Sequence, residues 1–510
     1  MATRTKRKTK QALSFWSILI RTLPVFAGML CFCSARWFVS TYGRIGFDSV
    51  LFTLTAGLSG VQSGLITAYL TDALLPAVLL TGVICLLLFI LPGRKFKWIP
   101  KWITAVFSLL LTLGLIVFAA FDVQLVDYLF SSRANSDLYE QEYVDPATAV
   151  ITFPEQKRNL IYIFLESMET TYLSRELGGA EDENLIPELY DLALDNINFS
   201  NHEGVGGFHS APGATWTIGA MVSQTAGIPL KTPMEDYNAY GEGGTPFLPG
   251  VTSLSNILHD NGYYQSLMVG SFASFGGRRS YYTQHGTDVI YDLGSARRDG
   301  IVPSDYFEWW GMEDLYLFEY AKQELTRIAA QEQPFAFTML TVDTHHIGGY
   351  QCALCGDTHE EQYENVISCS SRQVLDFVQW IREQDFYENT TVIICGDHCS
   401  MDKGYFSRNI DSGYERLVYN CFINSAVTTD HTKNRDFCAV DLFPTTLAAM
   451  GCTIEGDRLG LGVNLFSDLP TLTERMGYPA FSGKLAMASE YYTANFYSDA
   501  DRELIGQEAE

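Results

Sequence analysis

Three apolar stretches near the N-terminus place the strongest limit on how this chain can fold. They lie near residues 15–39, 73–91 and 102–121, and each is close to the roughly 20 residues that an α-helix needs to cross a bilayer. Backbone polar groups in lipid must be satisfied internally, so such stretches are expected to be helical. The sequence therefore predicts an N-terminal membrane region over residues 1–130 with about three transmembrane helices.

The distribution of basic residues predicts how these helices are oriented. A removed signal peptide is the competing interpretation of the first stretch, but no small-residue cleavage site stands out and further apolar stretches follow. Basic residues occur in TRTKRKTK at the start of the chain and in GRKFKWIPK, residues 93–101. Both lie in the cytoplasm by the positive-inside rule. Three crossings then predict a multi-pass protein of the bacterial cell (cytoplasmic) membrane whose large domain is extracytoplasmic.

The segment 47–70 leaves the number of crossings open. It is apolar, but Gly57, Ser59, Gly60, Gln62 and Gly64 interrupt it. A fourth crossing would return the large domain to the cytoplasm. We therefore expect an interfacial or re-entrant segment on the outer side.

The charge balance changes sharply after the membrane region. Residues 1–121 hold 12 of the 34 Lys and Arg and only two acidic residues, whereas the remainder has 22 basic against 57 acidic residues. A domain this acidic lacks the basic surface that nucleic acid requires, so we expect no nucleic-acid partner. Broad electrostatic adhesion to anionic lipid headgroups is disfavoured for the same reason.

The acidic part predicts an α/β fold. A polar segment over 131–156, broken by two prolines, is expected to be a linker, 157–475 the catalytic domain, and 476–510 a C-terminal extension ending in a solvated tail. Short, nearly continuous apolar runs at 159–166, 263–270, 334–343 and 390–397 are typical of strands buried on both faces of a mostly parallel sheet. Helical patterns at 251–260, 313–331 and 369–384 lie between them.

Several of these strands end in residues that can do chemistry. Glu166 follows the first run, Asp343, His345 and His346 follow the third, and Asp397 and His398 follow the fourth. Ligands of open parallel sheets bind beyond the carboxyl ends of the strands. Two carboxylates and an imidazole suit one divalent cation, so Glu166, Asp397 and His398 are candidate ligands for Mn²⁺, with Mg²⁺ and Zn²⁺ as alternatives.

Thr215 opens the apolar run TWTIGAMVSQTAGIPL and has two interpretations. As the N-cap of a helix, its hydroxyl would accept hydrogen bonds from free backbone N–H groups. As a fourth metal ligand, the same hydroxyl would lose its proton more easily and become a nucleophile. A helix N-terminus also attracts phosphate, so the two interpretations are compatible.

The eight cysteines of the acidic part allow a disulfide if that part lies outside the cell. A single CxxC, Cys352 to Cys355, is weak evidence for zinc without a second pair. We expect Cys369 to bridge to one of these two.

The chain closely resembles the membrane-bound phosphoglycerol transferases, which include the periplasmic glucan enzyme and the lipoteichoic acid synthases of the alkaline phosphatase and sulfatase superfamily. NLIYIFLESMETTY, GATWTIGAMVSQTAGIPL, FTMLTVDTHH, SCSSRQV and GDHCSM carry the resemblance, in this order, over residues 157–450. It implies an alkaline phosphatase-like sandwich.

The resemblance also implies roles for individual residues. Glu166, Thr215, Asp397 and His398 match positions that hold a single metal ion, usually manganese, with Thr215 as the nucleophile. His345 matches a histidine that contacts substrate near the reaction centre, with His346 as its neighbour, and Arg278 matches an arginine that holds the phosphoglycerol group. Gly276 and Gly277 stand where the synthases carry a Trp, and Ile347 stands where a Pro often follows the histidine, so the acceptor is the feature that these departures put in doubt.

The expected reaction transfers phosphoglycerol from phosphatidylglycerol through a covalent threonine intermediate and releases diacylglycerol. The acceptor is a cell-envelope glycan, a glycolipid or a polyglycerolphosphate (teichoic acid) chain. The alternatives are a phosphoethanolamine transferase of the same fold and a non-catalytic membrane scaffold. A sulfatase is disfavoured because no Cys-x-Pro-x-Arg or Ser-x-Pro-x-Arg motif is present. The paired aromatics Trp309–Trp310 and Tyr281–Tyr282, and those near residue 490, are expected to serve packing.

Overall fold

The computed structural model describes residues 15–42, 47, 50, 63–87, 101–131, 134–231 and 246–508. They pack as two compact units. One unit consists of residues 1–40 and 62–126, and the other of residues 41–61 and 127–510.

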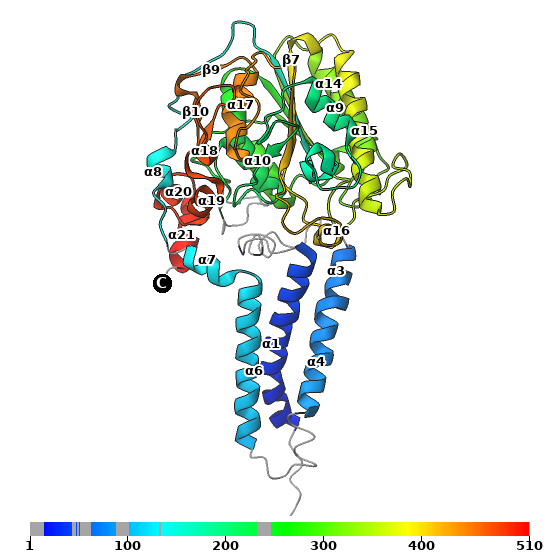
Figure 1. Ribbon diagram of the computed structural model, residues 1–510, viewed down its shortest axis with the longest axis vertical. Coiled ribbons are helices and arrows are strands. Elements are labelled where there is room, and N and C mark those ends of the chain that lie inside the picture. Colours follow the sequence, from blue (N-terminus) through cyan, green and yellow to red (C-terminus); the bar gives the residue numbers. More distant parts are fainter. Residues whose placement is uncertain are drawn as a thin grey trace, which may run out of the picture. The chain divides into compact units, whose positions relative to one another are not determined.

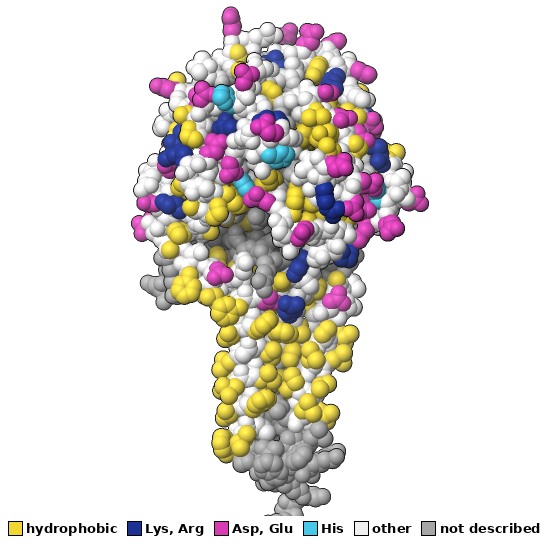
Figure 2. All heavy atoms as spheres, in the orientation of Figure 1, with side chains coloured by type: hydrophobic (Ala, Val, Ile, Leu, Met, Phe, Trp, Pro, Cys, Tyr) yellow, Lys and Arg dark blue, Asp and Glu magenta, His cyan; other side chains and the backbone are white. Residues whose placement is uncertain are grey.

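The first unit is helical. Its helices are α1 (Phe15–Tyr42), α3 (Ser63–Tyr69), a π-helical turn (Leu70–Leu74), α4 (Leu75–Cys85) and α6 (Lys101–Asp122) (Figure 1). Three stretches among the described residues are long and apolar enough to cross a membrane: Thr22–Tyr42, Ile66–Cys85 and Trp102–Asp122. Hydrophobic side chains cover the outside of these helices, as expected of surfaces that contact lipid (Figure 2).

The second span differs from the sequence prediction at its start. This apolar helix begins at Ile66 rather than near residue 73, so it includes the last residues of the 47–70 segment. The glycine-rich part of that segment, 51–62, lies outside the described residues, as do 88–100 with their basic cluster.

The second unit is built on a mostly parallel sheet. In the described part of the chain its strands run in the order β3-β8-β7-β2-β6-β4-β5. They are β2 (Asn159–Leu165), β3 (Gly207–Phe208), β4 (Tyr264–Val269), β5 (Val289–Tyr291), β6 (Phe335–Leu340), β7 (Thr390–Gly396) and β8 (Val418–Ile423). The strands from β7 to β5 pair in parallel, and β8 and β3 add an antiparallel edge. The predicted α/β fold with its four buried strands is confirmed.

Helices lie on both faces of this sheet (Figure 1). The remaining α-helices among the described residues are α7 (Leu125–Ser131), α8 (Leu138–Glu142), α9 (Pro187–Asp195), α10 (Thr217–Ala226), α11 (Leu254–Asp260), α12 (Arg278–Gln284), α13 (Leu293–Arg298), α14 (Asp314–Ala329), α15 (Gln362–Arg382), α16 (Lys403–Asn409), α17 (Leu442–Ala449), α18 (Leu472–Met476), α19 (Tyr478–Ala486), α20 (Glu490–Asn495) and α21 (Asp499–Glu508). Helix α15 begins seven residues before the predicted start at 369, because Glu361 and Glu364 form a capping box ahead of it.

Alternation along β2 divides the core into two layers. Leu160, Tyr162 and Phe164 pack with residues of α10, α11, α12 and α17, whereas Ile161 and Ile163 pack with residues of α9, α13, α14 and α15. Successive side chains of a strand point to opposite faces, so a strand covered on both sides is apolar throughout.

The segments that flank residues 157–475 contain more ordered structure than predicted. The expected linker contains α8, with Leu138 and Tyr139 buried, and the strand β1 (Ile151–Thr152), which pairs with β9 (Thr453–Ile454). A second short hairpin joins β10 (Arg458–Leu459) and β11 (Gly462–Val463). The predicted solvated tail forms α21, in which Asp501 is buried and accepts a hydrogen bond from the Ser498 hydroxyl.

Candidate active site

Two adjacent parallel strands bring three candidate metal ligands together. Glu166 follows the last residue of β2, and Asp397 and His398 follow the last residue of β7, where Leu165 pairs with Gly396. One ligand atom from each of Glu166, Asp397 and His398 lies within 4.8 Å of the others, and all three side chains are buried. The structure therefore gathers these residues at the carboxyl edge of the sheet.

Hydrogen bonds leave two of these ligand atoms facing each other without partners. Asp397 Oδ1 accepts hydrogen bonds from the backbone N–H groups of Ser167 at 2.8 Å and His398 at 2.7 Å. His398 Nδ1 lies 2.9 Å from the Cys399 carbonyl oxygen, which can only accept a hydrogen bond, so Nδ1 is the donor. In the neutral ring, Nε2 then carries a lone pair. Nε2 lies 3.3 Å from Asp397 Oδ2 and 3.8 Å from Glu166 Oε1.

This arrangement fits a cation. Asp397 Oδ2 and His398 Nε2 are buried and have no hydrogen-bond partner in the described part of the chain. Buried polar atoms are normally paired, and two acceptors that face each other are paired best by a shared positive charge. Ser167, directly after Glu166, holds a left-handed backbone with φ of 55°, a strain that tends to occur at functional sites.

The pKa values of the three groups reflect their crowding. Burial, followed by the charge of Glu166, raises the pKa of Asp397 to about 7. For Glu166, burial raises the pKa, but the nearby imidazoles of His345 and His398 outweigh burial and lower it. For His398, burial lowers the pKa, but the negative charges of Asp397 and Glu166 outweigh burial, so the pKa of His398 is raised. Two adjacent buried carboxylates resist ionising together, which a bound cation would relieve.

Thr215 does not cap a helix, contrary to one of its two interpretations. Helix α10 begins at Thr217, its N-cap is Trp216, and no side chain caps it. Thr215 is half-buried in the turn that enters the helix. The hydroxyl of Thr217 lies 3.4 Å from Glu166 Oε2, so this turn approaches the candidate metal ligands.

Arg278 points into the same region from α12. Its side chain is buried, and its Nη2 donates to the Ser271 hydroxyl at 2.9 Å and the Phe272 carbonyl at 3.0 Å. Its Nε has no partner among the described residues. Burial lowers the pKa of Arg278 to about 10, and the charges of Glu166 and Asp397 act in the opposite direction.

The backbone before Arg278 explains one departure from the family pattern. Gly276 and Gly277 have φ of 68° and 79°, a left-handed conformation that a bulky residue such as Trp adopts at a cost. The two glycines therefore turn the chain so that Arg278 begins α12.

His345 and His346 stack on each other with ring centroids 4.3 Å apart. His345 Nδ1 donates to the His346 carbonyl at 2.8 Å, which leaves Nε2 as an acceptor. Burial lowers the pKa of both imidazoles. The ring centroid of the buried Trp310 lies 4.3 Å from that of His345, so the packing role predicted for Trp310 includes holding this histidine.

Several supporting residues escaped the sequence analysis. Gln224 of α10 donates to the carbonyls of Gly396 at 3.0 Å and Asp397 at 3.2 Å, which fixes the end of β7. The sequence feature that could have pointed to Gln224 is its polar side chain within the otherwise apolar helical run of α10. Glu169 is fully buried and accepts hydrogen bonds from Arg416 and from the backbone of Ser400, just after His398. The sequence positions of Glu169 and Arg416 gave no indication that these two residues form an ion pair.

The expected disulfide is absent. All eleven cysteines are free, although Cys352, Cys355 and Cys369 lie close together. The sequence therefore correctly predicted that Cys369 lies close to Cys352 and Cys355, but the predicted disulfide between them is not formed.

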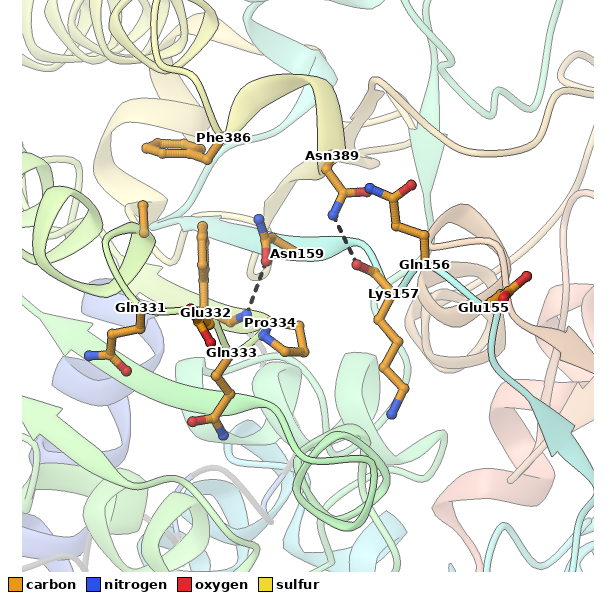
Figure 3. Close-up of a pocket in the computed structure, with 12 residues that line it drawn as sticks. Glu155, Gln156, Lys157, Asn159, Gln331, Glu332, Gln333, Pro334, Phe386 and Asn389 are labelled. Atoms are coloured by element: carbon orange, nitrogen blue, oxygen red, sulfur yellow. Dashed lines mark hydrogen bonds between the residues drawn. The ribbon is translucent and has the colours of Figure 1, made fainter.

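A surface pocket lies away from these residues, among the residues at the starts of β2, β6 and β7 (Figure 3). Lys157, Asn159, Pro334 and Asn389 are among its lining residues, and Asn389 donates to the Lys157 carbonyl at 2.9 Å. It contains none of the candidate ligands, and ligands of parallel sheets bind at the opposite, carboxyl edge. We assign it no role in the chemistry.

Comparisons with known proteins place the chain in context. A family model described as Sulfatase matches residues 158–452. Phosphoglycerol transferase I of Xanthomonas campestris pv. campestris (strain B100) is 33% identical over 304 residues, which cover 56% of this chain and 41% of that protein. Phosphoglycerol transferase I of Escherichia fergusonii is 29% identical over 364 residues, which cover 70% of this chain and 45% of that protein. The chain thus matches less than half of the length of these curated relatives.

The solved structure of the integral membrane lipooligosaccharide phosphoethanolamine transferase A from Neisseria meningitidis is similar in fold. It has a TM-score of 0.50 at 13% identity and covers 87% of this chain and 85% of that one. At this identity the similarity shows the fold alone.

Proposed function

Because the chain belongs to the sulfatase family, within the alkaline phosphatase superfamily, we propose that it transfers phosphoglycerol from phosphatidylglycerol to a cell-envelope acceptor. The observation that carries the proposal is the buried group of Glu166, Asp397 and His398, with unpaired atoms of two ligands facing each other. The similarity to phosphoglycerol transferases supports the choice of transferred group.

Glu166, Asp397 and His398 would hold one divalent metal ion, as members of this superfamily generally do, and we propose Mn²⁺. When bound, the ion would lower the pKa of a ligating hydroxyl and neutralise charge on the phosphoryl group. Gln224 and the Glu169–Arg416 pair would keep the ligands in place through the contacts described above.

Thr215 is the proposed nucleophile and fourth ligand. It gives up its hydroxyl proton and its Oγ attacks phosphorus, while the bond from phosphorus to the diacylglycerol oxygen breaks. The products of this step are a glycerophospho-threonine and diacylglycerol. Thr215 precedes by two residues the Thr217 hydroxyl that lies 3.4 Å from Glu166, which supports its proximity to the site.

His345 is the proposed proton carrier. It protonates the diacylglycerol oxygen as that oxygen leaves, and it then takes the proton of the acceptor hydroxyl, whose oxygen attacks phosphorus and releases Thr215. In the first step the Thr215 proton passes through His345 to diacylglycerol, and in the second step the acceptor proton passes through His345 back to Thr215, so the protons balance over the cycle. The lone pair on His345 Nε2 supports this role, because Nδ1 is engaged by the His346 carbonyl.

Arg278 and His346 are the proposed substrate-binding residues. Arg278 combines a fixed guanidinium with an Nε that lacks a partner among the described residues, and Arg suits bidentate contact with phosphate. His346 Nδ1 is also buried without a described partner, so it can bind a glycerol hydroxyl.

A membrane location fits a lipid donor. We propose a multi-pass protein of the bacterial cytoplasmic membrane with an extracytoplasmic catalytic unit, on the basis of its three long apolar helices. Anchoring would hold the catalytic unit beside the scissile phosphate at the bilayer surface. The proposed acceptor is a glycan, a glycolipid or a polyglycerolphosphate chain.

A phosphoethanolamine transferase remains the alternative because of the shared fold of the Neisseria enzyme. The first strand carries LESME, and the phosphoglycerol transferase relatives favour phosphoglycerol. A non-catalytic scaffold would be expected to lose a ligand, yet Glu166, Asp397 and His398 lie together.

The experiment uses purified full-length protein in detergent with Mn²⁺ and labelled phosphatidylglycerol or phosphatidylethanolamine. We expect diacylglycerol release from phosphatidylglycerol only. Thr215→Ala should abolish release, whereas Thr326→Ala, the matched change at an exposed threonine of α14, should retain it. Release by Thr215→Ala, or a preference for phosphatidylethanolamine, would contradict the proposal.

A further inference from the structure

A second buried group of metal-binding side chains lies outside the candidate active site. Cys352, Cys355 and Cys369 each place a sulfur within 4.8 Å of the other two, and their exposed fractions are 6%, 3% and 1%. Cys352 and Cys355 lie in the loop that follows His345 and His346, and Cys369 lies in α15. We propose that these three cysteines bind a structural zinc ion that fastens this loop to α15.

The spacing of the sulfurs is the first argument for a metal ion. Cys352 Sγ lies 3.8 Å from Cys369 Sγ and 3.6 Å from Cys355 Sγ. Zinc–thiolate bonds are about 2.3 Å, so two sulfurs at corners of a tetrahedron around one zinc lie about 3.8 Å apart. A disulfide would use two of the sulfurs and leave the third as an isolated buried thiol, whereas a metal uses all three equally.

The backbone around the CxxC is the second argument. The N–H of Leu354 donates to Cys352 Sγ at 3.4 Å, and the N–H of Cys355 donates to the Cys352 carbonyl at 3.2 Å. Gly356, directly after the pair, has φ of 74°, which turns the chain away from the sulfurs. The tight turn thus directs a backbone donor at a sulfur, as a thiolate requires.

Side chains from α15 complete the surroundings. Gln373 Nε2 donates to Cys369 Sγ at 3.4 Å, and Arg372 donates to the Cys355 carbonyl at 3.1 Å. Donors and a positive charge next to the sulfurs stabilise thiolates and orient them, in the way that outer groups support metal ligands. Soft thiolate ligands select zinc over the harder Mn²⁺ of an oxygen-rich site.

The fourth corner of the tetrahedron would be taken by water or a small anion. Among the residues that the structure describes, no further His, Cys, Asp or Glu joins the three-cysteine group. The ion would restrain the loop at Cys352, six residues beyond His346. Between these two residues, Gln362 of α15 already donates hydrogen bonds to the carbonyls of Gly348 and Gly349. The zinc would therefore help to position His345 and His346 without touching the substrate.

The test uses the purified full-length protein with Co²⁺ and Zn²⁺ as probes. Cobalt bound to three thiolates gives an intense sulfur-to-metal charge-transfer band in the near ultraviolet, which the oxygen and nitrogen ligands of the other site do not produce. We expect this band in the wild-type protein, its displacement by Zn²⁺, and its loss in Cys369→Ser. Cys452→Ser, a matched variant of a buried cysteine outside the group, should keep it.

A second measurement needs no variant. Titration of the native wild-type protein, as purified, with a mercurial reagent should release one zinc per chain, detected with a colorimetric chelator. In a separate sample that received no mercurial, alkylation without reductant should modify all three cysteines once the protein is unfolded in chelator. A protein that lacks the cobalt band, releases iron or no metal, or carries a Cys369 disulfide would overturn the proposal.

Discussion

Replacing Asp397 by Asn should stabilise the metal-free protein and abolish its response to manganese. The reason is that two buried carboxylates, Asp397 and Glu166, share a site without a cation to compensate them. The substituted amide would keep the Oδ1 contacts with the backbone of Ser167 and His398, and its nitrogen would face His398 Nε2, which lies 3.3 Å from the carboxylate oxygen that it replaces.

The magnitude follows from the pKa of Asp397. Burial and Glu166 raise this pKa from 3.8 to about 7, so the folded state binds the proton more tightly than the unfolded state does. Stability from this group is therefore present at low pH and is lost as the pH rises from about 4 to about 7. Each pKa unit corresponds to about 1.36 kcal/mol, which makes the loss at pH 8 about 4 kcal/mol at most. Asn avoids this loss.

Manganese should offset most of this difference in stability. An ion that binds only the folded state at 100 times its dissociation constant adds about 2.7 kcal/mol to the free energy of unfolding. The wild-type protein should gain this increment, and Asp397→Asn should gain almost none because a ligand is lost.

The assay is thermal unfolding of the purified full-length protein at pH 5 and pH 8, in chelator and in Mn²⁺. Asp441→Asn is the matched control, because burial also raises the pKa of Asp441 to about 7 and this residue lies outside the metal-binding groups of the described chain. The control should keep the manganese increment. The reasoning fails if Asp397→Asn is less stable than wild type in chelator at pH 8, or if manganese still stabilises it.

Three further predictions concern single side chains. Arg278→Lys should lower kcat/KM for phosphatidylglycerol by roughly ten- to a hundredfold, since a charge-assisted hydrogen bond contributes about 1.5–3 kcal/mol; an unchanged kcat/KM would remove Arg278 from the substrate site. Arg416→Met should destabilise the protein by about 3–5 kcal/mol in thermal or denaturant unfolding, because it leaves Glu169 charged and buried, and adding Glu169→Gln should restore most of the loss. His345→Gln should lower kcat by about 10²- to 10⁴-fold. Because burial lowers the pKa of His345, the rate of the wild-type enzyme should stay level from about pH 8 to about pH 6.5 and fall only below that pH. A fall in rate that begins above about pH 7 would contradict this role.

Much of the fold could be predicted because its signals are local. Strands such as β2 and β7 are covered on both faces, so their residues are apolar throughout and their limits are easily read. The candidate ligands Glu166 and Asp397 directly follow these strands, and parallel pairing then brings them together. The family motifs pointed to the same residues.

Other features depend on contacts between distant residues. Arg416 pairs with Glu169 across 247 positions, and Trp310 contacts His345 across a stretch that includes α14 and β6, so neither contact shows a pattern in the sequence. The start of α10 at Thr217 rather than Thr215 reflects an uncapped N-terminus at Trp216, where preferences for capping residues mislead. Asp501 is buried in a polar tail whose neighbours Asp499, Arg502 and Glu503 are exposed as predicted, and a polar composition does not single out the one buried residue.

The most direct test of the central claim is peptide mass spectrometry of the full-length protein after brief incubation with phosphatidylglycerol, Mn²⁺ and no acceptor. The mechanism predicts a glycerophosphate adduct on Thr215, lost when acceptor is added and absent from Asp397→Asn. An adduct on Thr217, or diacylglycerol release with no adduct on any threonine of this turn, would contradict it.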